Sequence, residues 1–181
     1  AGTEDSQTLL YGAYLMENFK ASDKLGFDIS TRIDKLNFDI NANELTTYNY
    51  STKSYEAGVG KYDIDNSFVL FSTKFGSTYA ISDSTNIYAS IASANQAPTT
   101  SELSDNKDLE KSQSVNYEIG LKTRTENFAS DLALFQNFVD DEIIQIKDTN
   151  GNSIYDNARK KKKKGLEYNL TYDVTSSVQI G

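Results

Sequence analysis

The chain has 181 residues and a formal net charge of −8 at pH 7, and it contains neither cysteine nor histidine. Disulfides, thiolate metal sites, cysteine nucleophiles and Ser-His-Asp triads are therefore excluded, together with the commonest general base. The acidic balance argues against nucleic-acid binding. No motif supports catalysis by carboxylates alone, so we expect a protein that is not an enzyme and that carries no cofactor and no metal site.

Strand-forming residues dominate the composition, with 12 Tyr and 9 Phe but only one Pro. Apolar and polar residues alternate along most of the chain, which is typical of strands with one apolar and one polar face. We expect an all-β protein with strands at residues 7–20, 24–37, 67–81, 86–93, 115–124, 128–147 and 157–172, and the start of an eighth at 177–181.

The second expected strand shows this alternation most clearly. Its two faces are Leu25, Phe27, Ile29, Thr31 and Ile33 on one side, and Gly26, Asp28, Ser30, Arg32 and Asp34 on the other. A whole polar face is costly in a protein core unless every group is paired, but it costs little against a water-filled lumen. No apolar run is long enough for a membrane-spanning helix, whereas barrel strands need only about 10 alternating residues each.

The connections between the expected strands alternate in length. Short turns fall at residues 21–23, 82–84, 125–127 and 174–177, and long polar connections at 38–66, 94–114 and 147–157, the first being a long loop with strand extensions at its ends. In an up-and-down antiparallel sheet, all short turns lie on one rim and all long loops on the other. Bacterial outer-membrane barrels have this asymmetry, while soluble sandwiches have no reason for it, so the pattern favours a membrane barrel.

Several stretches resemble the TonB-dependent outer-membrane receptors. They are YASIASANQAPTTSEL from Tyr88, LEKSQSVNYEIGLKT from Leu109, LFQNFVDDEIIQI from Leu134, NARKKKKKGLEYNLTYDV from Asn157 and, as an earlier hairpin, YGAYLMENFKASDKLGFDISTRID from Tyr11. Their order and spacing match the family across essentially the whole chain. The chain departs from the family at Asn95-Gln96, where an aromatic or basic pair is usual, and at Lys111, which follows Glu110 where Pro-Glu is common.

The resemblance implies an antiparallel up-and-down transmembrane β-barrel in the bacterial outer membrane. Residues 1–181 would form part of one barrel domain, with seven or eight of its roughly 22 strands. The resemblance also implies uptake of a scarce ligand, most often a ferric siderophore, with energy from the TonB complex. The plug, the TonB box and the terminal aromatic strand of such receptors would lie outside these residues. The residues alone leave two alternatives, a soluble or surface-exposed β-sheet binding module and a porin-like passive channel.

One group of candidate binding residues lines the first long connection. Its members are Tyr48, Asn49, Tyr50, Tyr55 and Tyr62. They either pack the loop or contact an incoming ligand, since aromatic side chains offer a large contact area at a low entropy cost.

A second group lies in the basic run before the seventh strand. Lys160, Lys162 and Lys164 share the parity of the apolar residues Leu166, Tyr168 and Leu170. They are therefore expected to point outward just above an apolar band, facing membrane lipid. There they either end a solvated strand or contact the phosphates of lipopolysaccharide as point charges.

Overall fold

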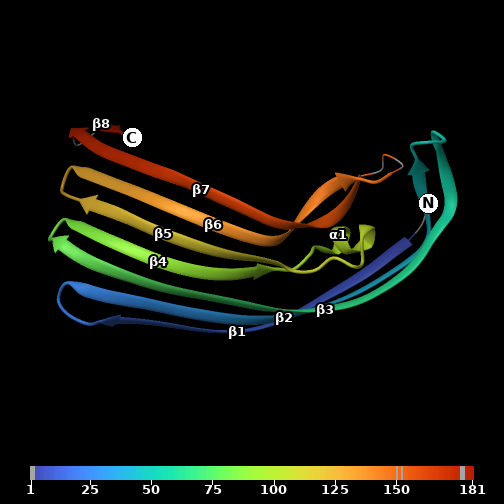
Figure 1. Ribbon diagram of the computed structural model, residues 1–181, viewed down its shortest axis with the longest axis horizontal. Coiled ribbons are helices and arrows are strands. Elements are labelled where there is room, and N and C mark those ends of the chain that lie inside the picture. Colours follow the sequence, from blue (N-terminus) through green and yellow to red (C-terminus); the bar gives the residue numbers. More distant parts are fainter. Residues whose placement is uncertain (1–2, 150, 152, 176–177) are drawn as a thin grey trace.

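The computed structural model describes residues 3–149, 151, 153–175 and 178–181, without the side chains of residues 43–45, 47, 57–62, 159 and 175. Its strands form one antiparallel sheet in chain order, as Figure 1 shows. They are β1 (Thr3–Lys20), β2 (Leu25–Asn49), β3 (Ser54–Ser82), β4 (Thr85–Gln96), β5 (Ser112–Arg124), β6 (Phe128–Lys147), β7 (Ser153–Thr175) and β8 (Val178–Ile180), with helix α1 (Thr100–Asp105) after β4.

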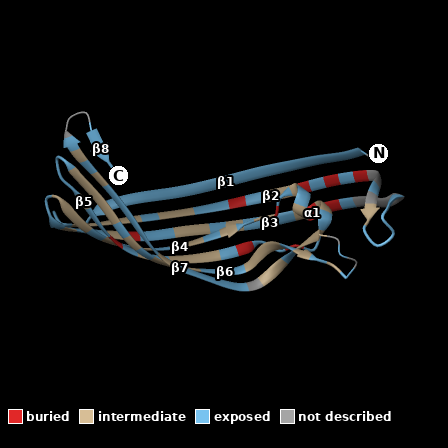
Figure 2. Cartoon of the chain, turned by 90° about the horizontal axis from the view of Figure 1, so that it is seen from above, coloured by how far each residue is buried: buried red, intermediate tan, exposed pale blue. Residues whose placement is uncertain are grey.

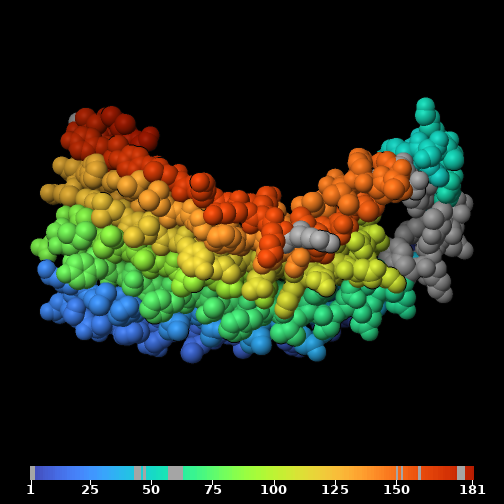
Figure 3. Space-filling model, in the orientation of Figure 1, coloured from blue at the N-terminus to red at the C-terminus, as the bar shows by residue number. Residues whose placement is uncertain are grey.

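Each strand lies beside its neighbours in the sequence, so the colours of Figure 3 succeed one another in chain order across the molecule. The expectation of an all-β protein with an up-and-down antiparallel sheet is confirmed. Within the described residues the sheet stays open, because β1 and β8 are its two edges. The only described helix, α1, is six residues long, and no described helix is long and apolar enough to cross a bilayer.

The sheet has an apolar and a polar face, and the apolar face is the more exposed one. Cross-strand pairing aligns residues of β2 to β5 in rows that alternate between the two faces. One row is Ile29, Phe75, Ile91 and Tyr117, and the next row, on the opposite face, is Asp28, Gly76, Ser90 and Glu118. Ile91 is 41% exposed, whereas Ser90 is half-buried. We call the apolar side the outer face and the polar side, on which α1 lies, the inner face.

The exposed apolar surface extends over the outer face of β2 to β7. Its residues include Ile33, Phe71, Ile119, Leu134 and Leu166, whose exposed fractions range from 49% to 62%. On β7 the apolar outer positions run from Leu166 to Val174, close to the roughly 9–11 residues that a tilted strand needs to cross a bilayer. Soluble monomers rarely expose a continuous apolar surface of this kind, so the outer face is suited to lipid.

The two sets of connections lie on opposite rims of the sheet, as predicted, although two of the three expected long loops are mostly extended strand. Figure 1 shows the β1–β2, β3–β4 and β5–β6 turns at one end, and α1 with the tips of the β2–β3 and β6–β7 hairpins at the other. We call these ends the turn rim and the mouth rim.

The prediction of a long loop at residues 38–66 is wrong. β2 continues to Asn49 and β3 begins at Ser54, so only residues 50–53 separate the two paired strands. With 25 residues, β2 extends over roughly 80 Å, so this hairpin stands far beyond the apolar band. The connection expected at 147–157 is also shorter, because Lys147 at the end of β6 pairs with Ser153 at the start of β7.

Apolar and polar residues continue to alternate along β2 beyond the apolar part of the outer face, but there the apolar residues lie on the opposite face. From Leu36 onward the apolar residues lie on the inner face and the polar ones, such as Asn37 and Asp39, on the outer face. The physical reason is that α1 and its flanking residues cover the inner face there. The buried cluster consists of Phe38, Ile40, Ile64, Leu103 and Leu109. In Figure 2 the buried residues gather on β2 and β3 beside α1.

Candidate functional site

The connection between β4 and β5, residues 97–111, folds over the inner face at the mouth rim, and we call it the mouth loop. Its helix begins with a capping box. The Oγ1 atom of Thr99 accepts a hydrogen bond from the Glu102 amide, and the Glu102 carboxylate accepts one from the Thr99 amide at 2.7 Å. Leu103 then inserts into the buried cluster and is 0% exposed. The helix therefore anchors the mouth loop on the inner face of the β2–β3 hairpin.

Polar contacts tie the mouth loop to the strands on both of its sides. Toward β3, Asn66 Nδ2 donates to Lys107 O at 2.9 Å and Lys111 Nζ donates to Val69 O at 2.6 Å. Toward β7, Asn106 Nδ2 donates to Tyr155 O, the Tyr155 amide donates to Asp105 Oδ2, and Asn157 exchanges two hydrogen bonds with the backbone of Glu110, at distances of 2.8 to 3.0 Å. The mouth loop therefore connects the β2–β3 hairpin to the β6–β7 hairpin.

Three of the predicted ligand-contacting tyrosines meet at the tip of the β2–β3 hairpin. The ring of Tyr48 contacts those of Tyr50 and Tyr55 edge-on, with centroids 5.0 and 5.1 Å apart. Tyr50 is 59% exposed and Tyr55 is 75% exposed. The strand geometry places this tyrosine tip roughly 40 Å along β2 from Lys35 at the edge of the apolar band.

Asn49 and Tyr62 differ from the other three. The Oδ1 atom of Asn49 accepts hydrogen bonds from the amides of Ser51 and Thr52, and its Nδ2 donates to Glu56 at 2.7 Å. Asn49 therefore shapes the turn that presents the tyrosine tip. Tyr62 lies on β3 opposite Ala42, and its side chain is outside the described residues.

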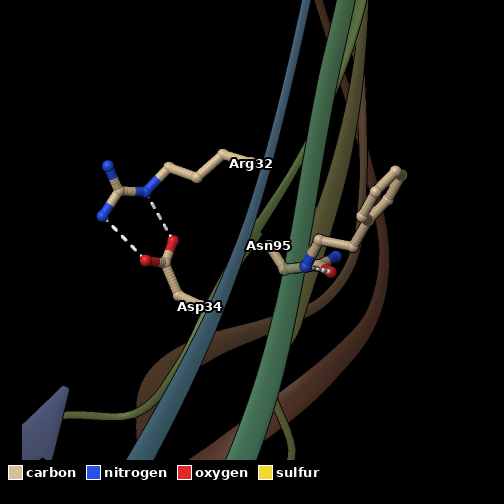
Figure 4. A network of polar contacts seen from close by, with 4 residues as sticks. Arg32, Asp34 and Asn95 are labelled. Carbon is tan, nitrogen blue, oxygen red and sulfur yellow. Dashed lines mark hydrogen bonds and ion pairs between the residues drawn. The ribbon is translucent and has the colours of Figure 1, made fainter. Parts of the chain in front are cut away.

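The inner wall below the mouth loop carries charges that are paired with one another. Figure 4 shows Arg32 donating from Nε and Nη2 to both oxygens of Asp34, at 2.6 and 2.7 Å. The same view contains Asn95, whose Oδ1 accepts a hydrogen bond from the Phe71 amide at 3.0 Å. Asp34 lies over its cross-strand partner Gly12, where a Cβ would collide with the carboxylate.

The same arrangement recurs lower on the wall. Lys74 pairs with Asp28 at 3.3 Å, and the Tyr88 hydroxyl donates to the Glu118 carboxylate at 2.7 Å. The ring of Tyr88 covers Gly120, which has no Cβ to obstruct it. An inner face with paired charges and with side chains lying along the sheet can border water, and it presents many hydrogen-bonding groups. Among the described residues, no group of three or more carboxylates is placed to hold a metal ion.

The five lysines from Lys160 to Lys164 on β7 lie alternately on the outer and the inner face of the sheet. The predicted outward set, Lys160, Lys162 and Lys164, continues the outer face above Leu166. The ammonium group of Lys162 lies 5.2 Å from the centre of the Phe138 ring. Lys160 and Lys162, with Lys161 between them, border a hollow of about 400 Å³ that lies between β5, β6 and β7. Lys164 follows toward Leu166 and is not part of its border.

The inward set of the same run is Lys161 and Lys163. Both bind the carboxylate of Glu142 on β6, at 2.7 and 3.3 Å. The hydrogen bond from Lys161, supported by the one from Lys163, holds the pKa of Glu142 below its ordinary value. Strand alternation alone does not predict Glu142 as the partner, because Glu142 follows Asp141, whose φ of 54° interrupts the regular strand.

The fold is similar to that of several solved transporters and receptors. For the copper transporter OprC the TM-score is 0.78, with 16% identity over 95% of this chain and 28% of that chain. For the ferric-catecholate import receptor Fiu from E. coli K12 the TM-score is 0.70, with 16% identity over 96% and 27%. For the alcaligin outer-membrane receptor FauA from Bordetella pertussis it is 0.67, with 20% identity over 96% and 28%. At these identities the likeness shows the fold alone, and the chain spans under a third of each structure.

The family match is independent of these structures. Residues 2–181 match the family described as TonB dependent receptor-like, beta-barrel. This match agrees with the apolar outer face and with the sorted rims, and it does not support a soluble binding module. The barrels of this family lie in the bacterial outer membrane. The chain is therefore an outer-membrane β-barrel segment, and it belongs to the TonB-dependent receptor family.

Proposed function

We propose that this chain supplies part of the wall and mouth of a receptor that imports a ferric siderophore across the outer membrane. The observation that carries the proposal is the tyrosine tip, three clustered rings that a tall hairpin holds beyond the apolar band. Exposed aromatic rings offer flat, rigid contact area to an organic ligand at a low entropy cost. The mouth loop below them would narrow the entrance on the inner face.

The ligand class follows from the chemistry of the tip and from similar proteins. Among the similar structures, one is named as a ferric-catecholate import receptor, one as an alcaligin receptor and one as a copper transporter. Tyrosine rings suit the organic shell of a chelate better than a bare copper ion, which prefers imidazole and sulfur ligands. A chelated ferric ion is therefore the first substrate to test, and copper is the second.

The energy source and the remaining partners would lie outside these residues. In the proposed mechanism the TonB complex acts through the N-terminal region of the receptor, and the paired charges of the inner wall face the interior through which the ligand passes. The competing porin-like function differs in one measurable respect, since a passive channel needs no energy coupling.

Uptake in cells tests this proposal directly. The full-length protein is expressed in a Gram-negative strain that lacks its own siderophore receptors, in versions with and without TonB. The cells are given radioactive iron bound to a catecholate or to a hydroxamate chelator, or copper alone. We expect saturable uptake of one ferric chelate that disappears without TonB. Uptake that persists without TonB would instead support a passive channel, and uptake of copper alone would overturn the choice of ligand.

The tyrosine tip is tested with a pair of variants. Replacing Tyr50 and Tyr55 together by Ala should weaken binding of the transported chelate roughly 30-fold, because each of the two buried aromatic contacts contributes about 1 kcal/mol. Tyr168, which is 55% exposed on the outer face, is the matched control, and Tyr168→Ala should leave binding unchanged. Equal affinities of the tip variant and the parent protein would remove the tip from the site.

A further inference from the structure

The basic run Lys160–Lys164 lies where the apolar outer face of β7 ends. Its inward members are neutralised within the chain, since Lys161 and Lys163 both bind Glu142. Among the described residues, no ion pair joins Lys160, Lys162 or Lys164 to a carboxylate. The chain therefore satisfies the inward positive charges and leaves the outward ones without an anion.

Two of the outward lysines, Lys160 and Lys162, border a hollow on the outer face, and Lys164 follows on the same face toward Leu166. The floor of the hollow includes Tyr117 and Phe138, whose rings meet edge-on with centroids 6.2 Å apart. Lys162 lies over the Phe138 ring, which places its ammonium group above an aromatic surface. Asp140, the cross-strand partner of Lys160, is the carboxylate that also borders the hollow. Lys160 and Lys162 set two positive charges against this one carboxylate, and Lys164 adds a third positive charge beside the hollow, so the outer surface here is positive.

The position of the hollow indicates which kind of anion would balance its positive charge. Directly below it on the outer face are Leu134 and Leu166, which are 52% and 62% exposed and pair across β6 and β7. An acyl chain lying along these residues would bring its head group to the level of the lysines. Ammonium groups at the edge of the hydrocarbon region reach for phosphates in that layer.

The spacing of the lysines favours a head group with more than one phosphate. Alternate residues of a strand are about 6.6 Å apart, so the three ammonium groups extend over roughly 13 Å. The hollow also lies toward the mouth rim, on the side of the tyrosine tip. We propose that Lys160, Lys162 and Lys164 hold the phosphate groups of one lipopolysaccharide molecule in the outer leaflet, with its acyl chains along the outer face below them.

This lipid site stands apart from the proposed import function, and its test separates the two. The full-length protein, freed of bound lipid in detergent, is titrated with lipid A carrying two phosphates. The comparison probes are lipid A with one phosphate, phosphatidylglycerol and inorganic pyrophosphate. Replacing Lys160, Lys162 and Lys164 by Gln should weaken binding of the two-phosphate lipid on the order of 100-fold, at about fivefold per lysine. Iron uptake by the same variant should be unchanged.

Matched variants keep the proposal falsifiable. Lys161→Gln with Lys163→Gln removes two charges from the same run but from the inner face, and it should change lipid A binding less than about threefold. Replacing the three outward lysines by Arg should retain binding, which separates loss of charge from misfolding. The proposal is overturned if the outward Gln variant binds lipid A normally, or if the inward variant loses as much. Equal binding of phosphatidylglycerol or pyrophosphate would also overturn it.

Discussion

Leu103 is the residue on which the position of the mouth loop depends most. It is fully buried among Phe38, Ile40, Ile64 and Leu109, and it comes from a helix of only six residues. A helix this short is not stable by itself in water. Replacing Leu103 by Ala should therefore loosen the whole mouth loop from the inner face while β2 and β3 remain paired.

The size of the effect follows from the burial. Truncating a fully buried Leu to Ala typically costs 2–5 kcal/mol, because the transfer free energy is lost and a cavity remains. A cost of about 3 kcal/mol would raise the open fraction of the mouth loop on the order of 100-fold. Leu103→Met nearly conserves the volume and should cost less than about 1.5 kcal/mol.

Hydrogen exchange of the full-length protein in detergent measures this opening. The reporting amides are those of Leu103 and Asn106, which donate to Thr99 O and Glu102 O at 3.0 and 2.8 Å. They should exchange on the order of 100-fold faster in Leu103→Ala, while amides in the centre of β4 keep their rate. An increase below about threefold would refute the anchoring role of Leu103. Equal acceleration in β4 would show that the sheet, and not the loop, had opened.

Two further predictions concern the outer face and the β6–β7 hairpin. Ile119→Arg places a charge on the apolar outer face beside Ala89 and Leu134. In lipid vesicles it should lower the free energy of unfolding, measured with urea, by about 2–4 kcal/mol. A decrease no larger than that of Ile119→Leu would contradict the lipid-facing assignment. Because the folded pKa of Glu142 is lowered, its ion pairs stabilise the hairpin above the ordinary carboxyl pKa and are lost as pH falls through the folded value. The protection factors of amides near Lys161, which are corrected for the pH dependence of the chemical exchange rate, should thus fall in acid. Glu142→Gln should have low protection already at neutral pH and should remove this pH dependence.

The sequence was a good guide wherever strand residues face lipid on one side and water on the other. The expected strand at 128–147 has the bounds of β6, and the expected turn at 21–23 lies within the β1–β2 turn. The parity of Lys160, Lys162 and Lys164 also places them on the outer face, as predicted. In these regions one periodicity and one phase describe the whole strand, so the pattern of residues is sufficient.

The mouth loop contains a helix that the alternation of apolar and polar residues does not reveal. Residues 94–114 are predicted as one long polar connection, and α1 lies within it. Thr99 and Glu102 have the spacing of a capping box, and Leu103 follows as the first apolar residue, which together are a helix-start signal. No sequence signal places the partners of this loop, because Asn66 and Asn157 come from strands that only the tertiary structure brings to it.

The missed hairpin has a different physical cause. From Leu36 to Asn41 the residues alternate as regularly as in the apolar band, but the apolar parity moves from the outer to the inner face. The change occurs at the pair Lys35 and Val69, which face each other across β2 and β3. Below this level the outer face meets hydrocarbon, and above it the inner face meets the mouth loop. A reversal of phase within an unbroken alternation therefore marks the height at which a barrel strand leaves the bilayer, and it does not mark the end of the strand.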